Sequence, residues 1–130
     1  MTQRTKNAVI FFSAAALLVL TLAGPADAQR RQYFGAIALS PSTGAIGWAF
    51  DHPSQVSAEN QALRGCYNYA GDCRVGTWFR NACGAVAIGN GGGWGAAWGG
   101  SRRAAENAAI NACNRNTNRC TVRRWVCTAR

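Results

Sequence analysis

The chain has 130 residues, 48% of them hydrophobic, and its 14 lysines and arginines outnumber 5 aspartates and glutamates for a formal net charge of +9. This length accommodates one small domain, which excludes a multidomain enzyme and a membrane protein with many spans. The hydrophobic content excludes a disordered basic tail, because such segments are poor in apolar residues.

Residues 1–28 have the pattern of a secretory signal peptide. Arg4 and Lys6 precede an apolar run that is almost uncharged, and small residues at the end of the run provide a cleavage site. The run is shorter than the roughly 20 residues that a membrane-spanning helix needs. We therefore expect cleavage after Ala28, a secreted or periplasmic location, no membrane span in the cleaved chain, and one mature domain over residues 29–130.

The mature chain contains an internal repeat. Residues 35–39 and 84–88 have nearly the same sequence, and further matches continue along the chain at a slightly shorter offset. The recurring residues include Ser54, Cys66, Cys73, Val75 and Trp78, which correspond to Ser101, Cys113, Cys120, Val122 and Trp125. Such self-similarity indicates a duplicated supersecondary unit. We therefore divide the domain into two copies, residues 33–81 and residues 82–128.

Each copy is predicted to begin with a β-hairpin. Apolar runs at 33–39 and 82–88 lead into turn-forming segments at 40–44 and 89–93. The residues that follow alternate between bulky and small side chains: Ile46, Trp48 and Phe50 against Ala45, Gly47 and Ala49, then Trp94, Ala96 and Trp98 against Gly95 and Ala97. A period of two predicts a pleated strand with one bulky face and one small face.

A helix and a closing strand complete each copy. Ser54 and Ser101 are N-cap candidates, and small residues follow them at helical spacing: Ala58, Ala62 and Cys66, then Ala105, Ala109 and Cys113. Closing strands are expected at 74–80 and 121–128. The predicted fold is α+β, a tandem duplication of a ββαβ unit with two helices and mainly antiparallel strands, in one shared sheet or two abutting sheets.

Six cysteines in an exported domain of about 100 residues indicate a disulfide framework. The simplest pairing lies within each copy and gives the bridges Cys66–Cys73, Cys113–Cys120 and Cys83–Cys127. A crossed pairing between the copies, Cys66–Cys120 with Cys73–Cys113, keeps the same symmetry, so both alternatives remain. Because the chain is rich in Gly and Ala and has few large core residues, we expect the disulfides to contribute much of its stability.

These motifs resemble a bacterial secreted family known as domain of unknown function 4189. The resemblance covers residues 33–127 and is carried by the placement of Cys, Trp and Gly, as in Gly47-Trp48, Asp72-Cys73-Arg74-Val75 and Trp78-Phe79-Arg80-Asn81-Ala82-Cys83-Gly84. It implies a small exported, disulfide-bonded domain. It assigns no catalytic residue and no binding site to this chain.

Two pairs of residues suggest catalysis but fit structural roles better. His52 follows Asp51, yet neighbours on a strand point to opposite faces, so we interpret His52 as a turn residue. Glu59 and Glu106 could suggest a glycosidase, but one acid in the first turns of each helix is typical of helix-dipole compensation. We therefore expect no enzymatic activity, with a small hydrolase as the least favoured alternative.

Motifs for phosphate and metal binding are also weak. The glycine-rich segment 89–95 lacks the Lys-Ser/Thr ending of a P-loop and leads into a strand, so it is predicted to be a flexible hairpin tip. The cysteine spacing does not match a zinc site, and oxidised thiols would not bind zinc. No cofactor and no metal are expected.

Arginines concentrate in the second copy near tryptophans, which suggests a binding surface. The candidate residues are Arg102, Arg103, Arg115, Arg119, Arg123, Arg124, Trp94 and Trp98. Arginine captures phosphate and carboxylate groups and stacks on indole rings. The alternative is that the tryptophans are core residues and the arginines a solvated rim. We expect a non-catalytic binding protein whose partner is an anionic envelope polymer or an acidic protein rather than nucleic acid, with inhibition of a secreted lysozyme or protease as the alternative.

Overall fold

The computed structural model describes residues 31–130, so the predicted signal peptide and its cleavage site lie outside the described residues. The elements are β1 (Phe34–Leu39), β2 (Ile46–His52), α1 (Gln55–Tyr67), β3 (Arg74–Arg80), β4 (Cys83–Ile88), the 3-10 turn η1 (Asn90–Gly92), β5 (Trp94–Gly99), α2 (Arg102–Asn114) and β6 (Thr121–Cys127). The predicted ββαβ order occurs twice, which confirms the α+β fold and its duplicated architecture.

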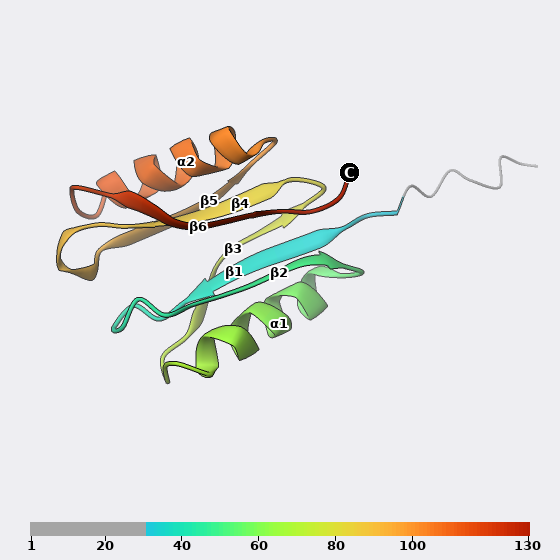
Figure 1. Cartoon of the computed structure of the whole chain (residues 1–130), viewed down its shortest axis with the longest axis horizontal. Helices are drawn as coiled ribbons and strands as arrows, with labels where there is room; N and C mark the ends of the chain where they lie inside the picture. Colours follow the sequence, from blue (N-terminus) through green and yellow to red (C-terminus); the bar gives the residue numbers. More distant parts are fainter. Residues whose placement is uncertain (1–30) are drawn as a thin grey trace, which may run out of the picture. The chain divides into compact units, whose positions relative to one another are not determined.

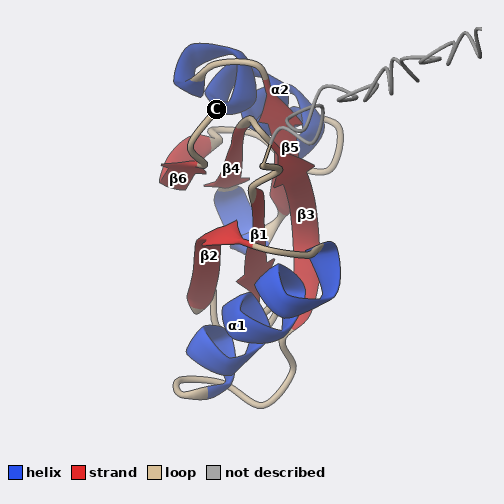
Figure 2. Cartoon of the chain, turned by 90° about the vertical axis from the view of Figure 1, so that its right-hand side faces the viewer, coloured by secondary structure: helices blue, strands red, loops and turns tan. Residues whose placement is uncertain are grey.

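Each copy forms its own antiparallel sheet. The strand orders are β2-β1-β3 and β5-β4-β6, so the structure has two sheets and not one shared sheet. Figure 1 shows the resulting layers, with α1 outside the first sheet, the two sheets face to face, and α2 outside the second. In Figure 2, β6 lies above β2 on one side and β5 lies above β3 on the other.

The large apolar side chains lie between the two sheets. Ile37, Leu39, Phe79, Val86 and Val126 are buried there. The Phe79 ring fills space beside two glycines, because a Cβ added at position 35 or 84 would lie 2.3 Å from a ring carbon. The inter-sheet core is therefore centred on one aromatic side chain.

The helices pack on the outer faces of the sheets through small residues. A Cβ added at Gly47 of β2 would lie 2.0 Å from the Ala62 carbonyl oxygen, and one added at Gly95 of β5 would lie 2.1 Å from the Cys113 amide nitrogen. Each helix thus contacts the small face of one strand, with an approach that only glycine permits. The bulky face of the same strand must then point away from the helix.

Both predicted N-caps are confirmed. Ser54 Oγ accepts a hydrogen bond from the Ser57 amide at 3.1 Å, and Ser101 Oγ accepts one from the Ala104 amide at 3.1 Å. The backbone of both serines is itself extended, as helix caps require.

The disulfides have the pairing within each copy. Cys66–Cys73 and Cys113–Cys120 join the end of each helix to the start of the next strand, with Cα atoms 6.0 Å apart in both bridges. Cys83–Cys127 joins two directly paired residues of β4 and β6. The crossed pairing is therefore not present.

Candidate functional site

The bulky faces of β2 and β5 leave aromatic rings at the borders of the sheets. Both are outer strands, so their large side chains are only partly covered by the facing sheet. Trp48 and Phe50 of β2 are 39% and 52% exposed, and Trp98 of β5 is 61% exposed. Aromatic rings of this size are usually more buried, so these positions mark candidate binding surfaces.

One border carries two stacked pairs of arginine and tryptophan. The Arg124 guanidinium on β6 lies 3.8 Å from the centre of the Trp48 ring on β2, so it bridges the two sheets. The Arg102 guanidinium at the start of α2 lies 4.0 Å from the centre of the Trp125 ring. We call this group of Trp48, Phe50, Arg102, Arg124 and Trp125 the basic edge.

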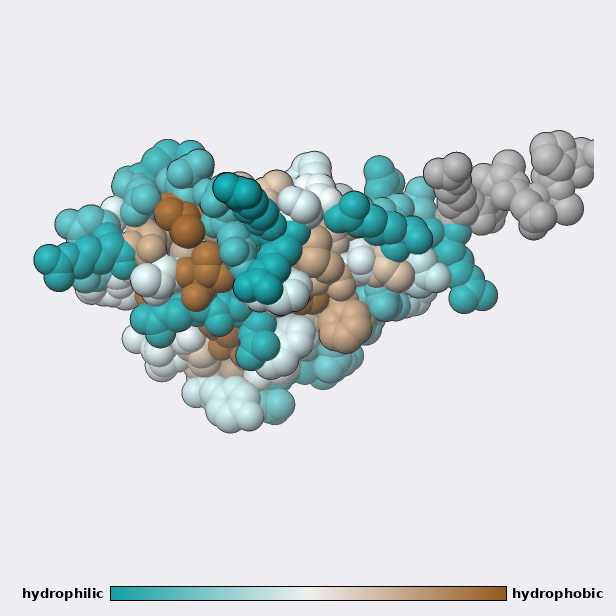
Figure 3. Space-filling view, turned by 45° about the horizontal axis from the view of Figure 1, so that its top comes forward, coloured by the Kyte–Doolittle hydropathy of each residue, from teal (hydrophilic) through white to brown (hydrophobic). Residues whose placement is uncertain are grey.

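The positive charge belongs mainly to the second copy. Residues 81–130 contain seven arginines and one glutamate, whereas residues 31–80 contain four arginines and three acids. Within residues 31–130 the one ion pair joins Arg102 Nε to Glu106 Oε1 at 2.7 Å. In Figure 3, the face of the α2 half is mostly hydrophilic with small hydrophobic areas between. Most guanidinium groups of this half thus remain available to an anion.

The arginines and tryptophans predicted as a surface do not form one patch. Arg102 and Arg124 belong to the basic edge, while Arg123 lies beside the hairpin tips. Three further arginines are exposed along α2 and in the loop after it: Arg103, Arg115 and Arg119. Trp94 is half-buried against the inter-sheet core, and Trp98 lies at the opposite border.

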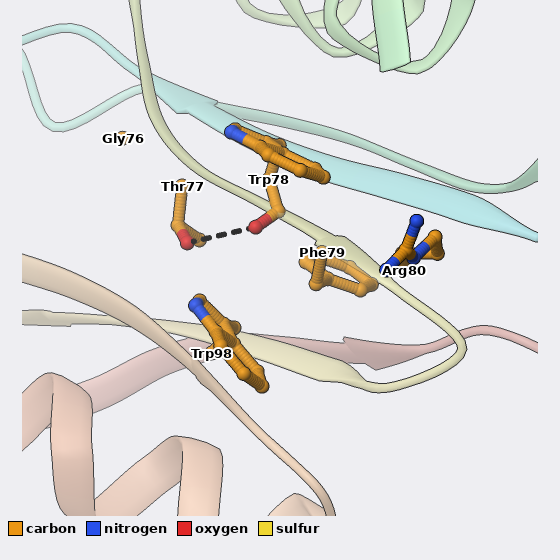
Figure 4. Close-up of a pocket in the computed structure, with 6 residues that line it drawn as sticks. All are labelled: Gly76, Thr77, Trp78, Phe79, Arg80 and Trp98. Carbon is orange, nitrogen blue, oxygen red and sulfur yellow. Dashed lines mark hydrogen bonds between the residues drawn. The ribbon is translucent and has the colours of Figure 1, made fainter. Parts of the chain in front are cut away.

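The opposite border, between β3 and β5, is open. It contains a cleft of about 410 Å³ lined by Gly76, Thr77, Trp78, Phe79, Arg80 and Trp98. Figure 4 shows the Trp98 ring on the side of β3 where the Phe79 ring lies, and the Trp78 ring on the opposite side of that strand. We call it the aromatic cleft.

Several interactions define the walls of the aromatic cleft. Trp78 stacks on Phe34 with ring centres 6.4 Å apart, which supports it from behind. Arg80 Nη1 donates a weak hydrogen bond to Gln32 Oε1 at 3.5 Å. The Thr77 hydroxyl donates to the Trp78 carbonyl oxygen at 3.5 Å. The cleft thus combines apolar walls with one hydroxyl and one cation.

Sequence reasoning missed Trp48, Phe50 and Trp78 as surface residues. The alternation along residues 45–50 identified the bulky face of the strand. It could not show that this strand lies at a border, because strand order depends on pairing between distant segments.

His52 and Asp51 have separate structural roles. His52 Nδ1 lies 3.3 Å from the Ser57 hydroxyl near the start of α1. Asp51 Oδ1 accepts a hydrogen bond from the Ala129 amide at 2.7 Å, which ties β2 to the segment after β6. The two side chains therefore contact different parts of the chain. His52 is the last residue of β2 and not a turn residue as the sequence suggested, and the left-handed backbone of Asp51 (φ 58°) makes this end of the strand irregular.

The two glutamates are held by residues of their own helices. Glu59 accepts from Gln55, and Glu106 pairs with Arg102, each four residues earlier. The first turn of both helices lacks acidic residues, so the glutamates do not stand as close to the helix starts as the sequence suggested. Their carboxylates therefore act in local side-chain contacts.

Asp72 connects the loop before β3 to the turn after β1. Its carboxylate accepts hydrogen bonds from the Ser40 hydroxyl and from the Ser42 amide, the latter at 3.1 Å. The hydrogen bond from Ser40, followed by those from Ser42, holds the pKa of Asp72 below its ordinary value of 3.8. The carboxylate is exposed, so this contact stabilises a loop rather than a buried site.

The described residues contain neither a cluster of metal-ligand side chains nor a helix that could span a membrane. Within residues 31–130, no three side chains of His, Cys, Asp or Glu are grouped as metal ligands. Over the same residues, none of the helices has the length and apolar character to cross a membrane.

The chain is similar to known proteins in sequence and in structure. The model of a family described as a domain of unknown function, DUF4189, matches residues 34–127. The NMR structure of Rv1813c from Mycobacterium tuberculosis is similar, with a TM-score of 0.55 and 29% sequence identity over 96% of this chain and 99% of that chain. No curated protein matches the sequence.

Proposed function

We propose that this chain, which belongs to the DUF4189 family of domains of unknown function, is an exported non-catalytic protein that binds an anionic polymer of the cell envelope through its basic edge. The signal-like sequence of residues 1–28 supports export. The six cysteines support an oxidising compartment, because all six form disulfides.

The observation that carries this proposal is the stacking of Arg124 on Trp48. Stacking holds a guanidinium by its flat face and leaves its N–H groups at the rim free to bind an anion. Because the pair spans the two sheets, the cation stands on a rigid part of the fold. A pre-ordered guanidinium loses less conformational freedom when it binds phosphate or carboxylate.

The distribution of charge favours a polymer over a small anion. The arginines of the second copy extend from the start of α2 through the loop after it and along β6. A single small anion would contact one or two of these side chains, whereas a polymer with repeated charges contacts many. Such multiple ionic contacts make the affinity strongly dependent on salt.

Polyphosphate, an anionic polymer without rings, tests the proposal on residues 29–130 with the disulfides formed. We expect binding that falls by more than about tenfold between about 50 and 200 mM salt. The double variant R102A/R124A should bind more weakly than R64A/R74A, which removes two exposed arginines of the first copy.

Equal losses in the two variants would overturn the assignment of the basic edge. An absence of binding to polyphosphate and to other charged polymers would overturn the function itself. A salt-resistant complex of fixed stoichiometry with a secreted lysozyme or protease would instead support an inhibitor.

A further inference from the structure

The two borders of the sandwich are equivalent positions of the duplication, which allows a residue-by-residue comparison. In the first sheet, Ile37 is paired with Trp48 on one side and Thr77 on the other. In the second sheet, Val86 is paired with Ala96 and Arg124. Trp48 therefore corresponds to Ala96, and Arg124 corresponds to Thr77.

This correspondence shows one difference between the two borders. At the basic edge, Arg124 and Trp48 stack across the gap between the outer strands. At the other border the equivalent side chains are a threonine and an alanine, so no such stacked pair crosses it. Ala96 lies close to Gly76, because a Cβ added at that glycine would be 3.0 Å from the Ala96 Cβ, and Thr77 lines the aromatic cleft of about 410 Å³.

We infer that the aromatic cleft is a second binding site, separate from the basic edge, and that it takes a pyranose ring bearing a carboxylate, as in an acidic oligosaccharide. The indole faces of Trp78 and Trp98 carry partial negative charge. The C–H groups on the face of a sugar ring carry partial positive charge and stack on such surfaces. The cleft volume lies in the range of small-molecule sites and admits one or two rings.

Arg80 supplies the preference for an acidic ring. Arg80 is one of the residues that line the cleft, and within residues 31–130 its side chain makes one weak hydrogen bond, to Gln32. It can therefore bind a carboxylate with two parallel hydrogen bonds. The Thr77 hydroxyl lies in the same cleft and can exchange its weak contact for a sugar hydroxyl.

The charge around the cleft favours an acidic sugar over a nucleic-acid strand. Proteins that bind single strands combine stacking rings with a positive groove that follows the backbone. The first copy, which provides five of the six lining residues, has four arginines against three acids over residues 31–80. One cation beside two rings matches one charged sugar residue better than a chain of phosphates.

Trigalacturonic acid is the probe for this site. Maltotriose is the uncharged sugar control, and a thymidine oligonucleotide tests whether the cleft binds a nucleic-acid strand instead. NMR of the indole N–H groups of the disulfide-bonded domain reports which tryptophan each probe contacts. We expect trigalacturonic acid to shift the indole signals of Trp78 and Trp98 at lower concentrations than the signal of Trp48, because the basic edge also contacts carboxylates. Tighter binding of the oligonucleotide, or shifts confined to Trp48 and Trp125, would overturn the inference.

Variants then test the walls of the cleft. W98A should lower the affinity for trigalacturonic acid by about tenfold or more, as expected for a central aromatic anchor. R80Q should lower the affinity for trigalacturonic acid more than the affinity for maltotriose. Y69A, which removes an exposed ring outside the cleft, should change neither affinity. Equal effects of R80Q on both probes would remove the proposed preference for an acid.

A filled cleft provides an independent test that does not depend on losing a tryptophan. The variant T77L places a larger, uncharged side chain in the cleft that Thr77 lines. It should strongly reduce the shift of the Trp98 signal by trigalacturonic acid while polyphosphate binding by the basic edge persists. An unchanged Trp98 shift in a folded variant would overturn the inference and leave the proposed function standing.

Discussion

The border between β2 and β6 and the border between β3 and β5 derive from the same duplicated strands, yet they differ in what fills them. The first is crossed by a guanidinium stacked on an indole, and the second leaves two indoles beside an open cleft. The equivalent positions differ, with Trp48 and Arg124 at the first border and Ala96 and Thr77 at the second. A duplicated fold can therefore keep one framework and acquire two surfaces of different chemistry.

The largest expected loss of stability concerns the contacts between helix and sheet, where the two halves should behave alike. Either G47V or G95V would force a side chain into the backbone of the packed helix, so each should lower the free energy of unfolding by about 3 kcal/mol or more. Urea denaturation of the disulfide-bonded domain measures both. A tolerated valine at one position would show that the helices do not pack equivalently.

The disulfides should distinguish the halves. The cysteines of Cys83–Cys127 are 44 positions apart in the sequence, and removal of this bridge is expected to lower the free energy of unfolding by at most about 4 kcal/mol in the chain-entropy model. Removal of Cys66–Cys73, with a separation of 7, should cost at most about 2.5 kcal/mol. Thermal unfolding of C83A/C127A and C66A/C73A tests this order, and C83A/C127A should have the lower melting temperature. A lower melting temperature for C66A/C73A would contradict it.

Opening the basic edge is the converse of filling the cleft. The variant W48A/R124T gives this border the side chains of the open one and should cost about 1 kcal/mol for the lost stacking. It should also weaken polyphosphate binding without creating a second site for trigalacturonic acid, because the position equivalent to Arg80 is Cys127, which lies in a disulfide. Calorimetry of the variant measures the stoichiometry, and a second bound trigalacturonic acid would show that the acidic ring does not need Arg80.

The smallest effect concerns the loop contact of Asp72, for which the second copy has Arg119 at the equivalent position. Because folding lowers the pKa of Asp72 below 3.8, its contribution to stability is present above pH 3.8 and is lost as the pH falls through the lower folded value. D72N should therefore melt at a lower temperature than the parent protein near pH 6 and match it under strongly acidic conditions. A constant difference across this range would exclude the ionised carboxylate as the cause.

Local patterns were sufficient to predict the elements and their order. The alternation after residue 44, the serines before each helix and the spacing of alanines each depend on neighbours in the chain, so each was visible in the sequence. The repeat then showed that the same unit occurs twice. The disulfide pairing followed from this symmetry as one of two alternatives, and the structure has the one within each copy.

The binding surfaces could not be predicted in the same way, because they depend on contacts between copies. Arg124 and Trp48 belong to different copies and meet only after the sheets have stacked. Trp98 was a candidate from the sequence, but its neighbour in the cleft is Trp78 of the other copy. Composition had indicated an arginine-rich half without showing that the aromatic rings divide between two borders.

The glycine contacts beneath α1 and α2 have a consequence for how this domain can diversify. The outer strand of each sheet meets its helix through one face. Its other face begins with Ile46 or Trp94 against the inter-sheet core and ends with exposed rings at Phe50 or Trp98. A gene encoding this domain can therefore accumulate changes at the codons of those exposed rings, altering what the protein recognises while the packing beneath stays the same.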